Sequence, residues 1–265
     1  MDTVRTTTLR RMKAEARKIP VLTAYDAAFA RLLSAAGVPV LLVGDSLGMV
    51  VQGRDSTLPV TLDDMAYHSA AVARGAGGAM VIADLPFGSY NDPRQGLASS
   101  VTLMQAGAQM VKLEGGNEQV LAVIDTLSAY GIPVCAHLGL LPQSVHKAGG
   151  YRVQGREAAQ ADQIRAAAQA VQQAGAEMLV LECVPSALAG DISATLSIPV
   201  IGIGAGPDCD GQVLVVYDML GLTPGPLPRF CKDFMVGNGS LHAAVAAYVA
   251  AVSDGSFPAA EHGYA

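Results

Sequence analysis

Residues 109–137 read QMVKLEGGNEQVLAVIDTLSAYGIPVCAH, and this stretch holds the pattern that decides the fold. A short apolar run, Gln109–Leu113, ends in Glu114 and two glycines. An amphipathic segment, Glu118–Tyr130, follows, and a second apolar run begins at Ile132. Runs of five or six residues that are apolar on both faces are typical of buried parallel strands. The stretch therefore predicts a strand, a crossover helix and a second, parallel strand.

The same unit recurs along the chain. The other apolar runs, each usually bounded by Gly or Pro, are Pro20–Ala24, Pro39–Val43, Ala79–Ala83, Ile132–Ala136, Glu177–Leu181, Ile198–Ile203 and Val213–Tyr217. The other predicted helices are Asp26–Ala36, Asp63–Ala76 (with Thr61 as its N-cap), Asp92–Ala106, Glu157–Ala174, Ser186–Leu196 and Ser240–Val252. About eight strands in 265 residues favour an α/β fold of the (β/α)8 TIM-barrel type, because such barrels typically need about 250 residues. An open, doubly wound parallel sheet is the alternative.

One link departs from an ideal barrel, since Gly204 to Gln212 is too short to hold a full helix. No low-complexity linker divides the chain. We therefore expect a single barrel domain over residues 1–265, with an N-terminal helix and a C-terminal arm that begins near Ser253.

The composition excludes several classes of protein. Hydrophobic residues make up 51% of the chain and charged residues 15%, which is too apolar for a disordered protein and indicates a homo-oligomer that buries part of its surface. The formal net charge is −6, and one basic cluster stands out, which we interpret as the solvated face of a first helix. Without a further basic face, nucleic-acid binding is not expected. The cluster comprises Arg5, Arg10, Arg11, Lys13, Arg17 and Lys18.

The four cysteines are Cys135, Cys183, Cys209 and Cys231, and no two of them form a CxxC pair. A zinc site or a disulfide framework built from them is therefore not expected. Cys135 and Cys183 lie inside apolar runs, where a free thiol behaves as a small hydrophobic group. No stretch reaches the roughly 18–20 apolar residues of a membrane span. We expect a cytoplasmic protein.

Polar residues close several of the apolar runs. They are Asp45, Asp84, Glu114, His137 and Glu182. In a barrel the C-terminal ends of the strands converge on one face, so these side chains should meet there. Any one carboxylate alone could simply cap a helix or start a loop. Several together repel one another unless a cation neutralises them. Oxygen ligands without cysteine point to a hard ion, such as magnesium, calcium or manganese, and few protein ligands favour magnesium.

Other residues near these ends carry open alternatives. Lys112 and Glu114 lie on the same side of one strand, so Lys112 either pairs with Glu114 or binds an anionic substrate. Ser46 could donate to a substrate carboxylate or cap a helix. His137 could bind substrate or be a core histidine. The stretch Gly202-Ile-Gly-Ala-Gly206 has neither P-loop nor dinucleotide spacing and indicates a tight turn, or else backbone contacts to an anion. Together these residues predict metal-assisted proton abstraction next to a carbonyl group of a small oxyacid.

At these same positions the sequence resembles the ketopantoate hydroxymethyltransferase family, nearly from end to end. The motifs that carry the resemblance are Leu9-Arg-Arg-Met-Lys13, Leu22-Thr-Ala-Tyr-Asp26, Val43-Gly-Asp-Ser-Leu-Gly48, Ala83-Asp-Leu-Pro-Phe87, Val111-Lys-Leu-Glu-Gly115, His137-Leu-Gly-Leu140, Pro142-Gln143, Gly149–Arg156, Leu181-Glu-Cys-Val-Pro185, Gly202–Gly206, Asp210-Gly-Gln212, Asp218-Met-Leu-Gly-Leu222 and Phe257–His262. Any one of them is weak, but the ordered set is highly specific.

The resemblance implies a barrel of the phosphoenolpyruvate/pyruvate superfamily type, often a decamer. It implies Mg²⁺, 5,10-methylenetetrahydrofolate as one-carbon donor and 3-methyl-2-oxobutanoate as acceptor. The product would be 2-dehydropantoate, in pantothenate biosynthesis, formed by Mg-assisted enolate formation. Asp45, Asp84 and Glu114 fall on the metal positions of the family. Asp45, Ser46, Asp84 and Lys112 fall on its 2-oxo acid positions, and Glu182 falls on its proton acceptor.

Small departures from the family pattern leave all of these residues in place. Leu141 stands where the family usually has threonine, Ala27-Ala28-Phe29 differs from common forms, and Glu261-His262-Gly263-Tyr264 stands where a Ser-Phe pair is usual. Two other functions remain as alternatives. One is a C–C lyase of the same superfamily, which tetrahydrofolate dependence would distinguish. The other is a non-catalytic barrel that binds folate or pantothenate precursors.

Overall fold

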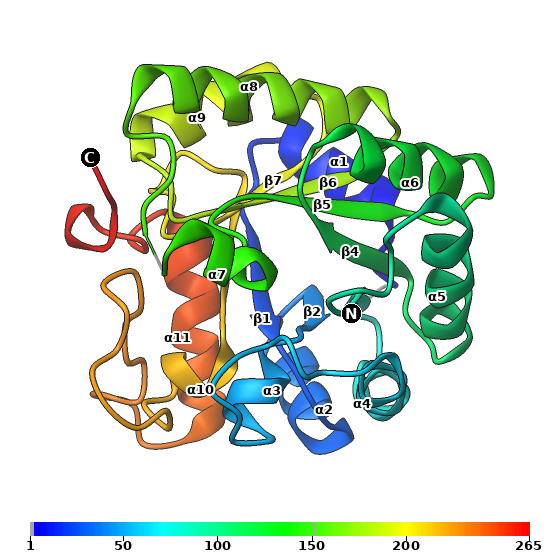
Figure 1. Cartoon of the computed structure of the whole chain (residues 1–265). Helices are drawn as coiled ribbons and strands as arrows, with labels where there is room; N and C mark the ends of the chain where they lie inside the picture. Colours follow the sequence, from blue (N-terminus) through cyan, green and yellow to red (C-terminus); the bar gives the residue numbers. More distant parts are fainter. Residues whose placement is uncertain (1–2, 151) are drawn as a thin grey trace.

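Eight parallel strands pair in sequence order, and β8 pairs with β1 to close a barrel (Figure 1). This computed structural model describes residues 3–150 and 152–265, so Tyr151 of the Gly149–Arg156 motif lies outside the described residues. The closed barrel confirms the TIM-barrel prediction and excludes the open sheet. The strands are β1 (Ile19–Thr23), β2 (Val40–Val43), β3 (Met80–Asp84), β4 (Met110–Glu114), β5 (Val134–Gly139), β6 (Met178–Glu182), β7 (Val200–Ile203) and β8 (Gly211–Leu214).

Helices surround the strands and form the outer layer (Figure 1). The α-helices are α1 (Thr6–Ala14), α2 (Ala27–Ala35), α3 (Leu47–Val50), α4 (Leu62–Gly75), α5 (Pro93–Gln105), α6 (Glu118–Ala129), α7 (Val145–Ala148), α8 (Ala158–Gln173), α9 (Ser186–Thr195), α10 (Val216–Met219) and α11 (Leu241–Asp254). Two short 3₁₀ helices, η1 (Pro142–Ser144) and η2 (Ala260–His262), complete the described elements. The expected cap of α4 is confirmed, because Thr61 Oγ1 accepts from the amide of Asp64 while the Asp64 carboxylate accepts from Thr61 N.

The region around β8 differs in part from the sequence prediction. As expected, the described chain forms no helix between β7 and β8. The strand predicted over Val213–Tyr217 is wrong in its second half, because β8 ends at Leu214 and α10 begins at Val216. The amide of Val216 donates to Thr23 Oγ1, a side chain of β1, at 2.9 Å. In a longer β8 this amide would instead donate to a backbone carbonyl of the neighbouring strand.

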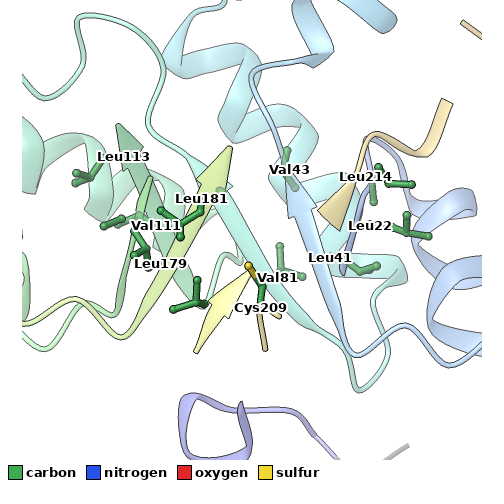
Figure 2. Close-up of a cluster of buried hydrophobic side chains, with 14 of the residues drawn as sticks. Leu22, Leu41, Val43, Val81, Val111, Leu113, Leu179, Leu181, Cys209 and Leu214 are labelled. Carbon is green, nitrogen blue, oxygen red and sulfur yellow. The ribbon is translucent and has the colours of Figure 1, made fainter. Parts of the chain in front are cut away.

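Side chains on each strand alternate between two cores. Those that point outward pack under the helices, as Figure 2 shows for Leu22, Leu41, Val43, Val81, Val111, Leu113, Leu179, Leu181 and Leu214. Those that point inward form a second cluster, which includes Ile19, Val21, Val40, Leu42, Met80, Ile82, Met110, Cys135, Met178, Val180, Ile201 and Val213. Leu9 and Met12 of α1 join this inner cluster. Helix α1 therefore closes the barrel at the N-terminal ends of the strands.

The position of α1 decides what its basic residues do. Arg5, Arg10, Arg11 and Arg17 are exposed, as the solvated-face interpretation predicts. Lys13 and Lys18 differ, because each is partly buried and donates to backbone oxygens of segments near the strand starts. Lys13 Nζ binds the carbonyl of Ser193 at 2.8 Å, and Lys18 Nζ binds that of Pro207 at 2.9 Å. Lys13 therefore holds α1 against the barrel, and Lys18, which directly precedes β1, holds the segment between α1 and β1 there.

The remaining sequence expectations concern cysteines, membranes and turns. All four cysteines are free and buried. None of the described helices is long and apolar enough to cross a membrane. Gly204 and Gly206 have φ of +61° and +80°, a left-handed conformation that suits glycine, which favours the tight-turn interpretation of Gly202–Gly206. A Cβ on Gly204 would lie 2.9 Å from the ring of Phe230, so the turn is also closely packed.

Candidate active site

The inner face of the barrel changes from apolar to charged along the strands. β4 shows this change, since Met110 belongs to the inner apolar cluster and Lys112 and Glu114 follow it on the same side. β3 ends in Asp84 and β6 ends in Glu182. Parallel pairing aligns these ends on the C-terminal rim of the barrel. All seven predicted site residues line one cavity there, of about 520 Å³: Asp45, Ser46, Asp84, Lys112, Glu114, His137 and Glu182.

Lys112 is paired with an aspartate on the next strand. Its Nζ lies 2.8 Å from Asp84 Oδ1, and both side chains are buried. The strand register puts Asp84 beside Lys112, so the alternative in which Lys112 pairs with Glu114 is wrong. Burial alone would lower the pKa of Lys112. The carboxylates of Asp84, Glu114 and Asp45 outweigh it and raise that pKa, so the ammonium stays charged.

Asp45 follows β2 and lies against the same group of charges. Its amide donates to Asp84 Oδ2 at 3.1 Å, which fixes the two aspartates relative to one another. Burial, and then the charges of Asp84 and Glu114, raise the pKa of Asp45 to about 8. Lys112 is the cation that opposes them. The pocket therefore holds a surplus of negative charge, which a bound cation would relieve.

Gln143 connects three parts of the site, and sequence reasoning gave it no role. Its Nε2 donates to Asp45 Oδ2 at 2.9 Å and to the carbonyl of Leu85 at 3.0 Å. Its backbone amide donates to Glu114 Oε2 at 3.0 Å, and its Oε1 accepts from the Tyr90 hydroxyl at 2.6 Å. A glutamine in a short 3₁₀ helix outside the strands carries no sequence signal of such contacts. The pair Pro142-Gln143 within the resemblance was the one available indication.

The loop that carries Gln143 begins with one of the departures from the family pattern. Leu141 stands immediately before η1, and it provides no side-chain hydrogen bond to the start of that helix. Threonine is a common N-cap residue, because its hydroxyl accepts from the first amides of a helix. Because Leu141 provides no cap, the contacts that Gln143 itself makes hold Gln143 in place.

His137 lies between two carboxylates. Its Nδ1 is 3.5 Å from Glu114 Oε1, and its Nε2 is 3.3 Å from Glu182 Oε2. Burial and the charge of Lys112 lower the pKa of His137, but Glu114 and Glu182 outweigh them and raise it to about 9. Neither ring nitrogen makes a well-aligned hydrogen bond within the described residues. An imidazolium at this position attracts the carboxylates of Glu114 and Glu182 and keeps them on opposite sides of its ring.

Ser46 does not cap the helix that follows it. α3 begins after Ser46 without a side-chain cap, so the capping alternative is wrong. The Ser46 hydroxyl instead lies 2.9 Å from the hydroxyl of Tyr25, a second residue without a role in the sequence analysis. Burial raises the pKa of Tyr25 above its usual value, so the phenol stays neutral and can donate. Ser46 is thus oriented by Tyr25 at the wall of the cavity.

The donor atoms here suit a hard divalent ion. Asp45 and Asp84 are adjacent, and magnesium commonly takes one or two carboxylates together with water or substrate oxygens. The described residues hold no ready group of three or more His, Cys, Asp or Glu side chains for a metal ion. Asp84 faces Lys112, and Glu114 accepts from the amide of Gln143. A three-carboxylate magnesium site from Asp45, Asp84 and Glu114 stays a prediction.

Known proteins resemble this chain over nearly its whole length. A family model described as ketopantoate hydroxymethyltransferase matches residues 3–260. The 3-methyl-2-oxobutanoate hydroxymethyltransferase of Thiobacillus denitrificans is 60% identical over 261 residues, which are 97% of this chain and 98% of that protein. The enzyme of the same name from Pseudomonas putida is 58% identical over 265 residues, 100% of this chain and 99% of that one.

Solved structures share the barrel at much lower identity. A 2,3-dimethylmalate lyase, a member of the PEP mutase/isocitrate lyase superfamily, aligns with a TM-score of 0.61 and 21% identity over 82% of each chain. A phosphonopyruvate hydrolase in complex with oxalate and Mg²⁺ aligns with a TM-score of 0.62 and 14% identity, over 79% of this chain and 80% of that one. These likenesses concern the fold alone, and they agree with the closed barrel of this chain.

Proposed function

The chain belongs to the ketopantoate hydroxymethyltransferase family, and from that premise we propose how its cavity works. It is a hydroxymethyltransferase of pantothenate biosynthesis. It transfers a hydroxymethyl group from 5,10-methylenetetrahydrofolate to 3-methyl-2-oxobutanoate and yields 2-dehydropantoate. The observation that carries our account of the site is the gathering of a cation, a hydroxyl and four carboxylates around one cavity.

The 2-oxo acid binds at the side of the cavity that Lys112 and Ser46 form. The Lys112 ammonium stays charged and attracts the substrate carboxylate, and Ser46, oriented by Tyr25, donates to it. Asp45, Asp84 and Glu114 would hold Mg²⁺ beside the keto group. When bound, the ion supplies Lewis-acid stabilisation of negative charge on the keto oxygen.

Glu182 accepts the proton from C3 of the bound acid. Its side chain is 14% exposed and lines the cavity, so a substrate can reach it. The imidazolium of His137, 3.3 Å away, orients the carboxylate of Glu182. Water hydrolyses the methylene bridge of the co-substrate, so both of its C–N bonds break, tetrahydrofolate leaves and the one-carbon unit remains at the oxidation level of formaldehyde. The carbanion bonds to that carbon, and the alkoxide that results takes up a proton to give the hydroxymethyl group.

Exchange of the C3 proton with solvent deuterium tests the role of Glu182, because exchange needs the base and the 2-oxo acid but no folate. Glu182→Gln keeps the shape of the side chain and removes its basicity. We expect exchange to fall roughly 10²–10⁴-fold with little change in binding of the 2-oxo acid. Glu118→Gln, at an exposed position on α6, is the matched control. Exchange at the normal rate in Glu182→Gln would assign the proton to another group.

Assembly, partners and location extend this proposal. We propose a homo-oligomer, a decamer by the resemblance, which would cover exposed apolar side chains such as Tyr67, Tyr130 and Val236. The partners would otherwise be the 2-oxo acid and the folate, without nucleic acid or membrane. Four free, buried cysteines suit a reducing cytoplasm. The C–C lyase alternative predicts turnover without tetrahydrofolate, so one assay with and without folate separates the two.

A further inference from the structure

The cavity is larger than its keto-acid site needs. A 2-oxo acid of five carbons occupies the rim of the inner strands, whereas a cavity of about 520 Å³ is of the size that takes a drug-sized ligand. The rest of its wall comes from segments outside the strands. Asp218, Arg229, Phe230 and Tyr264 lie there, and none of them belongs to the proposed keto-acid site.

Three of these side chains form a graded series from the interior to the surface. Asp218 of α10 is 9% exposed, Phe230 is half-buried and Arg229 is exposed. Cys231 joins the series, because its Sγ lies 3.9 Å from Asp218 Oδ2 and it directly follows Phe230 in the chain. The wall therefore presents a buried carboxylate, then an aromatic ring, then a guanidinium.

The C-terminal arm holds the outer end of this wall in place. The amide and hydroxyl of Ser186 both donate to the carbonyl of Tyr264, at 2.9 and 3.1 Å, which ties the arm to the start of α9. Arg229 Nε donates to the carbonyl of Glu261 at 2.8 Å, and its guanidinium lies 5.6 Å from the centroid of the Tyr264 ring. Figure 1 shows the red arm beside the orange segment that precedes α11. The contacts from Glu261 and Tyr264 orient Arg229.

We propose that Asp218, Phe230 and Arg229, with Tyr264, form the subsite for the folate co-substrate, with the pterin toward Asp218 and the glutamate tail toward Arg229. The proposal rests on the proposed function and deepens it. These residues of the chain would recognise the second substrate and set the direction in which it lies.

The chemistry of a reduced folate matches the series in order. The 2-amino group and N3–H of the pterin donate side by side, and a carboxylate accepts such a pair. The aminobenzoyl ring in the middle suits Phe230 and Tyr264. The glutamate carboxylates suit a guanidinium at the mouth. The reactive methylene group lies between the pterin and the aminobenzoyl ring, and the residue beside Glu182, Cys183, lines the same cavity.

Asp218 can act in this way because its present contacts leave it capacity to accept. Oδ1 accepts from the hydroxyl of Thr223, and each carboxylate oxygen can take more than one donor. Its buried position makes the contact selective, since a site built to pair with a donor rejects ligands that lack it. Folate analogues without the 2-amino group should therefore lose affinity for the native enzyme.

Calorimetric binding of two probes, tetrahydrofolate and tetrahydropterin, tests both ends of the subsite. Asp218→Asn should weaken both probes roughly 10- to 100-fold, because it removes a charged acceptor for the pterin that they share. Arg229→Met should weaken tetrahydrofolate about tenfold and leave tetrahydropterin unchanged, because only the folate has the anionic tail. Arg229→Lys should restore part of that loss. The matched controls are Asp125→Asn and Arg31→Met, at exposed positions on α6 and α2.

Deuterium exchange at C3 of the 2-oxo acid, measured without folate, separates this proposal from the proposed function. Both variants should exchange within about threefold of the native rate, which would place their defect in the folate step alone. Exchange lost together with folate affinity would show that the wall supports the whole site, and would overturn the proposal. So would unchanged tetrahydrofolate binding in Asp218→Asn, or equal weakening of both probes in Arg229→Met. If the native enzyme itself shows no exchange, the role of Glu182 fails while the binding results still decide the subsite.

Discussion

Replacing Gln143 with leucine should uncouple the carboxylates of the site while keeping the size of the side chain. The substitution removes the donor to Asp45 and Leu85 and the acceptor for the Tyr90 hydroxyl. A buried polar group left without its partner costs about 1–3 kcal/mol. Three such losses predict a decrease of about 3–9 kcal/mol in the free energy of unfolding, a large part of the 5–15 kcal/mol that is typical of a domain.

The same substitution should shift the pH dependence of the enzyme. Burial and the charges of Asp84 and Glu114 hold the pKa of Asp45 at about 8, and the hydrogen bond from Gln143 opposes them. Its loss raises that pKa further, and a rise of about one unit makes the ionised form about tenfold rarer at neutral pH. C3 exchange in Gln143→Leu should therefore need more magnesium at pH 7, and its acidic limb should move to higher pH.

Three measurements separate this reasoning from a simple loss of packing. Denaturant unfolding gives the stability, and exchange against pH and magnesium concentration gives the charge effect. Gln169→Leu, at an exposed position on α8, controls for the change of residue type. Tyr90→Phe removes only the hydroxyl and should cost about 0.5–1.5 kcal/mol with little change in the pH profile. An unchanged pH profile in a destabilised Gln143→Leu protein would refute the role of Gln143 in setting the charge of Asp45.

Three further predictions concern charge and packing. Lys112→Met leaves the buried carboxylate of Asp84 without its cation, so we expect a loss of about 3–5 kcal/mol of stability by denaturant unfolding and a large rise in the dissociation constant of the 2-oxo acid. Metal-free protein should lose stability from about pH 5 to pH 9 in thermal unfolding. The folded-state pKa values of Asp45 (about 8) and His137 (about 9) lie above the ordinary values of these groups. The stability that the two groups contribute is therefore complete below the ordinary pKa values and is lost as pH rises through 8 and 9. A flat stability profile over this range would contradict the prediction. Leu9→Ala should cost about 2–5 kcal/mol while C3 exchange in the folded protein stays normal, because α1 closes the end of the barrel opposite the site.

The elements of the barrel could be predicted because their signal is local. The run Gln109–Leu113 and the helix Glu118–Tyr130 fall within one residue of β4 and α6, since the apolar period and the glycines that end a strand belong to the segment itself. The run Val213–Tyr217 shows the limit of this reasoning. It is apolar enough for a strand, but Thr23, far away in sequence, accepts from the amide of Val216, where α10 begins.

The site divides in the same way. Asp84, Glu114 and Glu182 could be found because barrel topology brings strand ends together, whatever the loops do. The partner of Lys112 could not be found, because pairing across two strands depends on a register that the sequence of one strand does not contain. Gln143 and Tyr25 act through hydrogen bonds set by loop conformation, and neither residue type indicates such a role.

The charge arrangement explains why stability and chemistry occupy opposite ends of the barrel. Lys112 and His137 are the two buried cations against Asp45, Asp84, Glu114 and Glu182, and the raised pKa of Asp45 is the physical sign of that imbalance. Such a cluster would destabilise the centre of a small core, because unpaired buried charge costs several kcal/mol. Here the inner side chains below the charged cluster, such as Met110 and Met178, are apolar, and α1 covers them at the other end of the barrel. The barrel therefore keeps its packing, while the rim has fewer positive than negative charges. That shortage favours a divalent cation at Asp45 and Asp84, and the same cation would lower the pKa of Asp45 and restore the ionised carboxylate that binds it.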